Sequence, residues 1–185
     1  MTKDEIIRNL RMVSIERRTS WQTAWKAASI VAAYTLWKEC KFGAKRLAWL
    51  SAEIDKMHKA YLNGQLDYAE IIGYIEQIST ELVTHPAWVD ESNIMARKGS
   101  AIYAINKMLI QPTNDITEYT SMYFNLLFYI MSTHYGYKAK RLKRLHDNIQ
   151  KWLREYEYDN EEVVLKRWET DLRDYCGIVF EGIKI

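Results

Sequence analysis

The segment AYTLWKECKFGAKRLAWLSAEIDKM at residues 33–57 aligns without a gap with FYIMSTHYGYKAKRLKRLHDNIQKW at residues 128–152 when the chain is shifted by 95 positions. The alignment has eight identities in 25 positions, whereas typical residue frequencies would produce about one or two by chance. The identical pairs are Tyr34/Tyr129, Ala44/Ala139, Lys45/Lys140, Arg46/Arg141, Leu47/Leu142, Leu50/Leu145, Ile54/Ile149 and Lys56/Lys151. We therefore infer an internal repeat.

Each copy of the repeat has the pattern of an apolar helix, a turn with an aromatic residue and a glycine, and a second amphipathic helix that opens with Ala-Lys-Arg-Leu. Gly43 is expected to take the left-handed conformation that ends the first helix. The glycines are not aligned, because Gly43 faces Lys138 and Gly136 faces Lys41, so the two turns need not be identical. Each pair of helices has a face that it cannot bury alone, and we expect the copies to pack about a pseudo-two-fold axis.

Apolar periodicity and capping residues along the chain predict about eight helices. Their expected ranges are 3–18, 21–40, 44–62, 68–83, 92–110, 115–134, 138–156 and 160–175. The chain has only 7 glycines and 2 prolines, fewer turn residues than a β-sandwich or barrel needs. The predicted fold is an all-α duplicated helical bundle with related halves at residues 1–86 and 87–185 that share one core. The tail 178–185 has the composition of a short strand or a packed extended arm.

Composition limits the environment and the partners of this chain. Its 185 residues are 48% hydrophobic and carry a net charge of +2, which argues against a protein that binds nucleic acid through bulk charge alone. Two cysteines, Cys40 and Cys176, fit a reducing compartment better than a disulfide framework. The N-terminal residues lack an apolar signal core, and the weakly polar stretches 27–36 and 124–131 are too short to cross a bilayer. The expected location is the cytoplasm, with no membrane partner.

Motifs for catalysis or for metal binding do not stand out in the sequence. Four histidines, His58, His85, His134 and His146, share no metal-ligand spacing and are expected to be ordinary surface or capping residues. No Gly-rich phosphate loop, nucleophile elbow or dinucleotide fingerprint is present. The sequence therefore predicts a protein that is not an enzyme, with no catalytic residues, no metal and no cofactor.

The Ala-Lys-Arg-Leu segments place cations at the first turn of a helix in both copies. Cations are unfavourable there, because the helix dipole is positive at its N-terminus. A local rule broken twice at matching positions indicates an anionic partner or an internal carboxylate. Alternatively, these side chains cover apolar surface or pair with acids of the other half. The candidate binding residues for nucleic acid or an acidic partner are Lys45, Arg46, Lys138, Lys140, Arg141, Lys143 and Arg144.

Around Lys41-Phe42-Gly43-Ala44-Lys45-Arg46-Leu47 the chain resembles a group of small all-helical accessory proteins from phages and prophages of Gram-positive bacteria. The resemblance covers about 35 residues of the first half and extends to residues 136–145 of the second. Some phage proteins of this size and helical type are anti-CRISPR inhibitors of Cas9. The resemblance thus implies a phage-encoded factor that acts on a nucleic-acid machine of the host.

The leading functional hypothesis is a non-enzymatic anti-CRISPR protein that binds a Cas9–guide RNA complex in the host cytoplasm and blocks its action on DNA. Such a protein would use a mixed basic and aromatic surface, since its net charge of +2 differs from that of acidic DNA mimics. The alternative is a helix–turn–helix regulator that binds duplex DNA directly, with an affinity that falls steeply with salt. An enzyme with an unrecognised helical site and an oligomeric assembly subunit are further alternatives.

Overall fold

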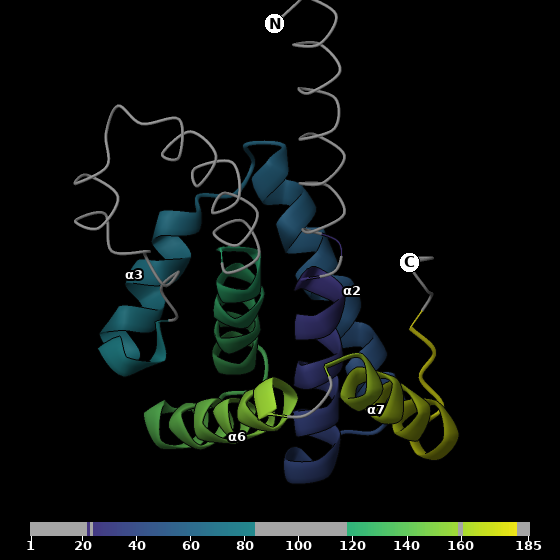
Figure 1. The fold of residues 1–185 in the computed structure, drawn as a ribbon. Coiled ribbons are helices and arrows are strands. Elements are labelled where there is room, and N and C mark those ends of the chain that lie inside the picture. Colours follow the sequence, from purple (N-terminus) through teal and green to yellow (C-terminus); the bar gives the residue numbers. More distant parts are fainter. Residues whose placement is uncertain (1–21, 23, 84–117, 159–160, 181–185) are drawn as a thin grey trace, which may run out of the picture. The chain divides into compact units, whose positions relative to one another are not determined.

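The computed structural model of this chain describes residues 22, 24–83, 118–158 and 161–180, and every regular element in this part of the chain is helical (Figure 1). The chain divides into two units, one formed by residues 1–25 and 85–121 and the other by residues 26–84 and 122–185. Nearly all of the described residues belong to the second unit. This unit draws on both of the halves predicted from the sequence.

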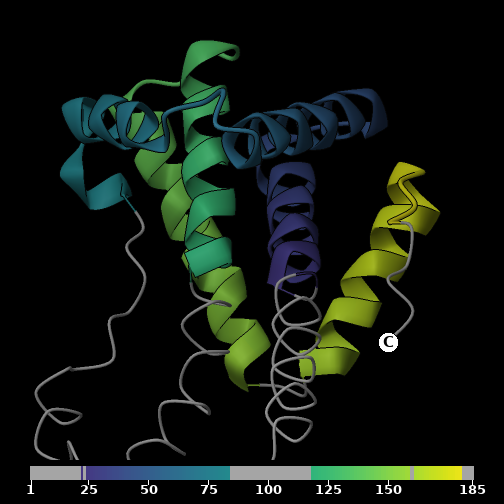
Figure 2. The ribbon, with the colours of Figure 1, turned by 90° about the horizontal axis from the view of Figure 1, so that it is seen from above.

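The second unit is built from helices joined by short connections. Helix α2 spans Ala44–Leu62, α3 spans Tyr68–Ile78, the 3-10 helix η1 spans Thr80–Leu82, α6 spans Ala139–Tyr158 and α7 spans Glu161–Cys176. Two further helices cover residues 24–40 and 118–133. Figure 1 shows these two running in the same direction, with α6 crossing below the end of the second. In both views the helix of residues 118–133 lies between α3 and α2 (Figures 1 and 2).

The helix of residues 118–133 forms the centre of the core. Residues 122–128 are all buried, as expected for a helix that is apolar all round and has neighbours on every side. Asn125 is the polar member of this stretch and is only 1% exposed. Its Nδ2 donates a hydrogen bond to the Tyr68 hydroxyl at 2.8 Å, which satisfies part of the buried amide.

Local signals in the sequence set several helix ends. The bounds of α2 are those predicted, and its buried face carries Leu47, Leu50 and Ile54. Asp67 caps α3 by accepting a hydrogen bond from the backbone N–H of Ala69 at 2.8 Å.

The prediction that this helix extends to residue 83 was wrong, because α3 ends at Ile78. Ser79 has an extended backbone (φ −169°, ψ 127°), which interrupts the helical path before η1. Leu82 on η1 is still fully buried, so the apolar period continues through the break.

The two turns of the repeat have the same backbone hydrogen bonds at positions 95 residues apart. The N–H of Phe42 donates to the carbonyl of Leu36 at 3.1 Å, and that of Tyr137 donates to the carbonyl of Met131 at 3.0 Å. After each turn, the N–H groups of residues 46 and 47, and of residues 141 and 142, donate to the carbonyl of residue 43 or 138 at 2.9–3.2 Å. The turns therefore match although their glycines are not aligned.

The left-handed residue of the first turn is Lys41, with φ 58°, and the equivalent residue of the second turn is Gly136, with φ 65°. The expectation that Gly43 takes this conformation was wrong. Gly43 is instead the extended N-cap residue of α2, with φ −87° and ψ 172°. The geometry of the turn places the left-handed residue one position before the aromatic residue whose N–H closes the turn, whichever side chain the sequence supplies there.

Replacing Lys41 with glycine is expected to raise the free energy of unfolding by about 0.5–1 kcal/mol, because an L-residue pays for the left-handed conformation and glycine does not. Urea unfolding followed by far-UV circular dichroism measures this change. The matched control is Gly136→Ala, which should destabilise the protein because it brings the same penalty into the second turn. If Lys41→Gly is less stable than the wild type, the left-handed backbone of Lys41 does not destabilise the protein as proposed.

An aromatic cluster joins the helix of residues 24–40 to α6 and α7. The ring centroid of Trp168 lies 5.1 Å from that of Tyr34, in a stacked arrangement, and 5.7 Å from that of Trp152, edge to face. Trp168 is 0% exposed. The Tyr34 hydroxyl donates to Oδ2 of Asp171 at 3.2 Å, and Lys26 pairs with Glu169 at 3.4 Å. These contacts bring together segments that are more than 100 residues apart in the chain.

Some predictions lie outside the described residues. They are the helices expected at 3–18 and 92–110 and the last five residues of the tail. Of the tail, Ile178–Phe180 lie in the described part, where they form no regular secondary structure. They follow Gly177, whose φ of +70° ends α7.

Candidate nucleic-acid interface

The two turns of the repeat pack against each other through aromatic rings. Phe42 of the first turn and Tyr135 of the second have ring centroids 5.0 Å apart. Trp49 on α2 adds edge contacts to Tyr135 at 5.8 Å and to His134 at 5.2 Å. The first turns of α2 and α6, which carry the predicted basic residues, therefore lie at the same place on the unit.

All seven candidate binding residues are exposed. We call this set the turn surface: Lys45, Arg46, Lys138, Lys140, Arg141, Lys143 and Arg144. The guanidinium carbon of Arg46 lies 5.6 Å from the ring centroid of Phe42, and that of Arg141 lies 5.5 Å from the ring centroid of Tyr137. The matched cation–π contacts hold one Arg of each copy against its own turn.

Within the described residues, only one of the seven cations has a carboxylate partner. Lys143 pairs with Glu81, an exposed contact that lowers the pKa of the Glu81 carboxyl through the hydrogen bond and charge of Lys143. No described carboxylate lies within 4.0 Å of the other six cations. The first turns of α2 and α6 contain no acidic residue. In the described part of the chain, internal pairing therefore does not compensate the turn surface.

Cys40 lies beside the turn surface but lacks the features of a reactive cysteine. Burial raises the pKa of its thiol above the ordinary value, while a hydrogen bond with Tyr137 acts in the opposite direction. A thiol with a raised pKa carries little thiolate at neutral pH, and the thiolate is the nucleophilic form. Both cysteines are free thiols.

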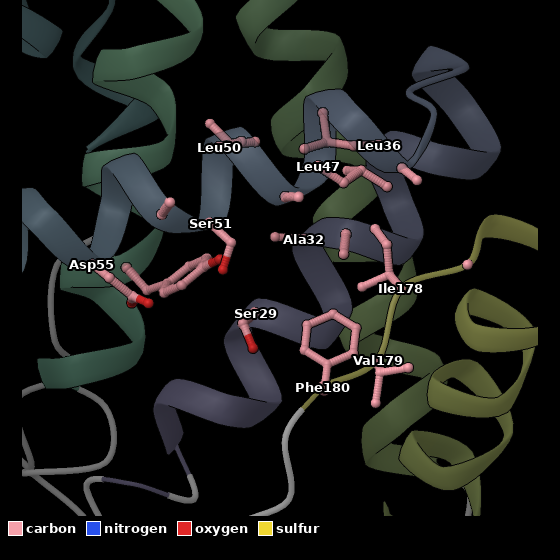
Figure 3. A pocket seen from close by; sticks show the side chains of 16 residues that line it. Ser29, Ala32, Leu36, Leu47, Leu50, Ser51, Asp55, Ile178, Val179 and Phe180 are labelled. Carbon is pink, nitrogen blue, oxygen red and sulfur yellow. The ribbon is translucent and has the colours of Figure 1, made fainter.

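A hollow of about 780 Å³ lies between the helix of residues 24–40 and α2 (Figure 3). Its walls are small or apolar and include Ala32 and Leu36 from the first helix and Leu47 from α2, while Ile178 and Phe180 of the tail run along its edge. Asp55 is the single ionisable carboxylate among the residues that line it. Tyr123 is the other titratable side chain of the lining, and the largely apolar walls of this groove suit an apolar occupant.

His58 is an exception to the expectation that the histidines are surface or capping residues. It is only 5% exposed on α2, so that prediction was wrong for this residue. His134 is exposed, and His146 is half-buried beside Asp147 at 3.3 Å. His85 lies outside the described residues. Burial lowers the pKa of His58 below 6.5, with the charge of Asp55 acting in the opposite direction.

The lowered pKa of His58 predicts a loss of stability in mild acid. Below pH 6.5 the unfolded chain protonates this side chain while the folded protein keeps it neutral, so the unfolded state binds more protons. The free energy of unfolding should therefore fall as the pH drops through 6.5 toward the lowered pKa. Urea unfolding of wild type and His58→Gln at several pH values measures this difference. The control His134→Gln, at an exposed position, should show the same dependence of the free energy of unfolding on pH as the wild type. If His58→Gln also shows the wild-type dependence, His58 is not the source of the loss of stability in acid.

Within the described residues, no group of three or more His, Cys, Asp or Glu side chains is arranged to hold a metal ion. In the same part of the chain, no helix is both long enough and apolar enough to span a membrane.

No protein-family model, no curated protein and no solved structure matches this chain.

Proposed function

We propose that this protein is a non-enzymatic factor that binds a nucleoprotein through the turn surface, with phosphate groups as the principal ligands. On the resemblance of the turn motif to phage accessory proteins, the target that we favour is a Cas9–guide RNA complex of the host. Binding of the protein would block the action of that complex on DNA. The host cytoplasm is then the place where the protein works.

The observation that carries this proposal is that two distant segments, each with exposed cations at the start of a helix, meet through packed aromatic rings. Six of the seven have no carboxylate partner among the described residues, and all seven are exposed. Lysine and arginine at the start of a helix, beside free backbone N–H groups, form a suitable environment for phosphate oxygens. The packed rings of Phe42 and Tyr135 join the two segments that carry these cations.

We also propose that the two helix–turn–helix segments arose by duplication and pack about a pseudo-two-fold axis. Three features of the first turn recur 95 positions later in the second turn, and they support this proposal. They are the backbone hydrogen bonds, the left-handed residue and the cation–π contact. Such a pair presents two similar basic turns side by side. Two equivalent contacts suit a ligand that repeats along its length, as a nucleic-acid backbone does.

The test is a cleavage assay in which a Cas9–guide RNA complex and its target duplex are titrated with this protein. Inhibition of cleavage together with binding to the complex supports the proposal. In parallel, fluorescence anisotropy of labelled duplex DNA is measured at about 50 and 200 mM salt. Tight, salt-dependent duplex binding without inhibition would instead support the direct DNA-binding regulator. The absence of both effects would overturn phosphate binding by the turn surface.

A further inference from the structure

A second basic and aromatic surface lies where the helix of residues 24–40 ends, close to the end of α7. It is a groove of about 460 Å³ whose lining includes Trp37, Lys38, Lys41 and Tyr175. None of the seven residues of the turn surface lines it. We call it the Trp37–Tyr175 groove, and the proposed function does not use it.

The aromatic part of the groove is a stacked pair with an open face. The rings of Trp37 and Tyr175 lie nearly parallel, with an angle of 13° between their planes and 6.2 Å between their centroids. Tyr175 is 76% exposed, the largest exposure among the exposed large apolar and aromatic residues of the described part. A ring held nearly parallel to a tryptophan but left open to solvent is a ready platform for another flat ring.

The cations of the groove lie around this pair. The ammonium of Lys38 lies 4.0 Å from the ring centroid of Trp37. The ammonium of Lys41 donates to the carbonyl of Lys38 at 3.1 Å, which leaves two of its three donors for a ligand. No described carboxylate lies within 4.0 Å of either ammonium.

Lys41 also occupies a strained backbone position, since its φ is 58° where the second turn has Gly136. Glycine would relieve this strain without changing the turn, as the second copy demonstrates. A residue kept in an unfavourable conformation at the edge of a groove is consistent with a role for its side chain.

We propose that the Trp37–Tyr175 groove binds an unpaired nucleotide of a single-stranded nucleic acid. The base stacks on the open face of Tyr175, and Lys38 and Lys41 contact the adjoining phosphates. Flat aromatic faces combined with cations are the usual means of holding single strands, because every base has a face that can stack. This inference rests on the proposed function, and it adds that the nucleic acid recognised has an unpaired segment.

The test compares single-stranded DNA and RNA oligonucleotides of about 12 nucleotides with the duplex of the same sequence, by fluorescence anisotropy. Tyr175→Ala is expected to weaken single-strand binding about tenfold and to leave duplex binding within about twofold, because paired bases do not offer a free face. Tyr175→Phe keeps the ring and should bind single strands as the wild type does. Val163→Ala, at a 61% exposed position on the same helix, is the control for a change on α7 away from the groove. Circular dichroism verifies that the variants are folded.

Unchanged single-strand binding in Tyr175→Ala would overturn the inference, and so would an equal loss on single strand and duplex. If Tyr175→Ala has no effect while charge reversal at the turn surface weakens binding, the proposed function stands and this inference fails. If single strands bind in a Tyr175-dependent way and the charge reversal changes nothing, the groove is supported and the turn surface is not. A preference for either DNA or RNA identifies the source of the nucleotide.

Discussion

Replacing Trp168 with alanine is expected to lower the free energy of unfolding by about 3–5 kcal/mol, the usual cost of deleting a fully buried tryptophan. The ring is 0% exposed and contacts Tyr34 and Trp152, which come from two other helices. Removing it leaves a cavity where the helix of residues 24–40, α6 and α7 meet. Because domains of this size are commonly stable by only about 5–15 kcal/mol, the variant should lose a large share of its stability.

Urea unfolding followed by far-UV circular dichroism measures this loss, and two further variants sharpen the result. Trp168→Phe keeps most of the packing and removes an indole N–H that is buried without a hydrogen-bond partner among the described residues. It should therefore cost less, about 1–2 kcal/mol. Trp49→Ala is the matched tryptophan deletion at a 41% exposed position and should also cost less than Trp168→Ala. Equal losses for Trp168→Ala and Trp49→Ala would contradict a central role for Trp168.

Charge reversal at the start of α6 should separate binding from stability. The variant Lys140→Glu with Arg141→Glu places two acids in the first turn of a helix that has none there. Acids are favourable at this end of the helix dipole, by about 0.3–1 kcal/mol each. The variant should therefore be at least as stable as the wild type while losing two cations of the turn surface. If phosphate is the ligand, affinity for nucleic acid or for the nucleoprotein should fall at least about tenfold. The slope of the logarithm of the binding constant against the logarithm of the salt concentration should decrease in magnitude by about 2.

The matched control for this change is Lys166→Glu with Arg167→Glu. It alters another adjacent and exposed Lys-Arg pair, on α7, and changes the net charge by the same amount. Its affinity should stay within about threefold of the wild type, since screening at physiological salt limits long-range charge effects. Full binding by the α6 variant, or equal losses in the two variants, would contradict specific contact by the turn surface. Retained thermal stability of the α6 variant excludes unfolding as the cause of a lost affinity.

Features that depend only on neighbouring residues could be predicted from the sequence. The bounds of α2, the Asp67 cap and the Gly177 end of α7 follow from backbone hydrogen bonding over a few positions. The buried residues Leu47, Leu50, Ile54, Leu142, Leu145 and Ile149 follow from the helical period. The basic turns were also visible as a repeated local pattern, although the sequence could not place the two copies next to each other.

Which of these local features come together depends on the packing of distant segments. The contact of Phe42 with Tyr135, which joins the two turns, is between residues 93 positions apart, and no local pattern predicts it. The left-handed position of the first turn fell on Lys41 although the sequence pointed to Gly43, because the turn geometry is the same in both copies.

Trp168 and Tyr175 show that, even within one helix, the sequence pattern does not predict which side chain is buried. They are seven positions apart on α7 and so lie on nearly the same side of it, yet Trp168 is 0% exposed and Tyr175 is 76% exposed. The helical period is a property of the local backbone and states only which side chains share a face. Burial depends on where a partner helix, folded from distant residues, begins and ends along that face. For this reason the sequence predicted the helices and the basic turns, and only the packed structure distinguished a core ring from a surface platform.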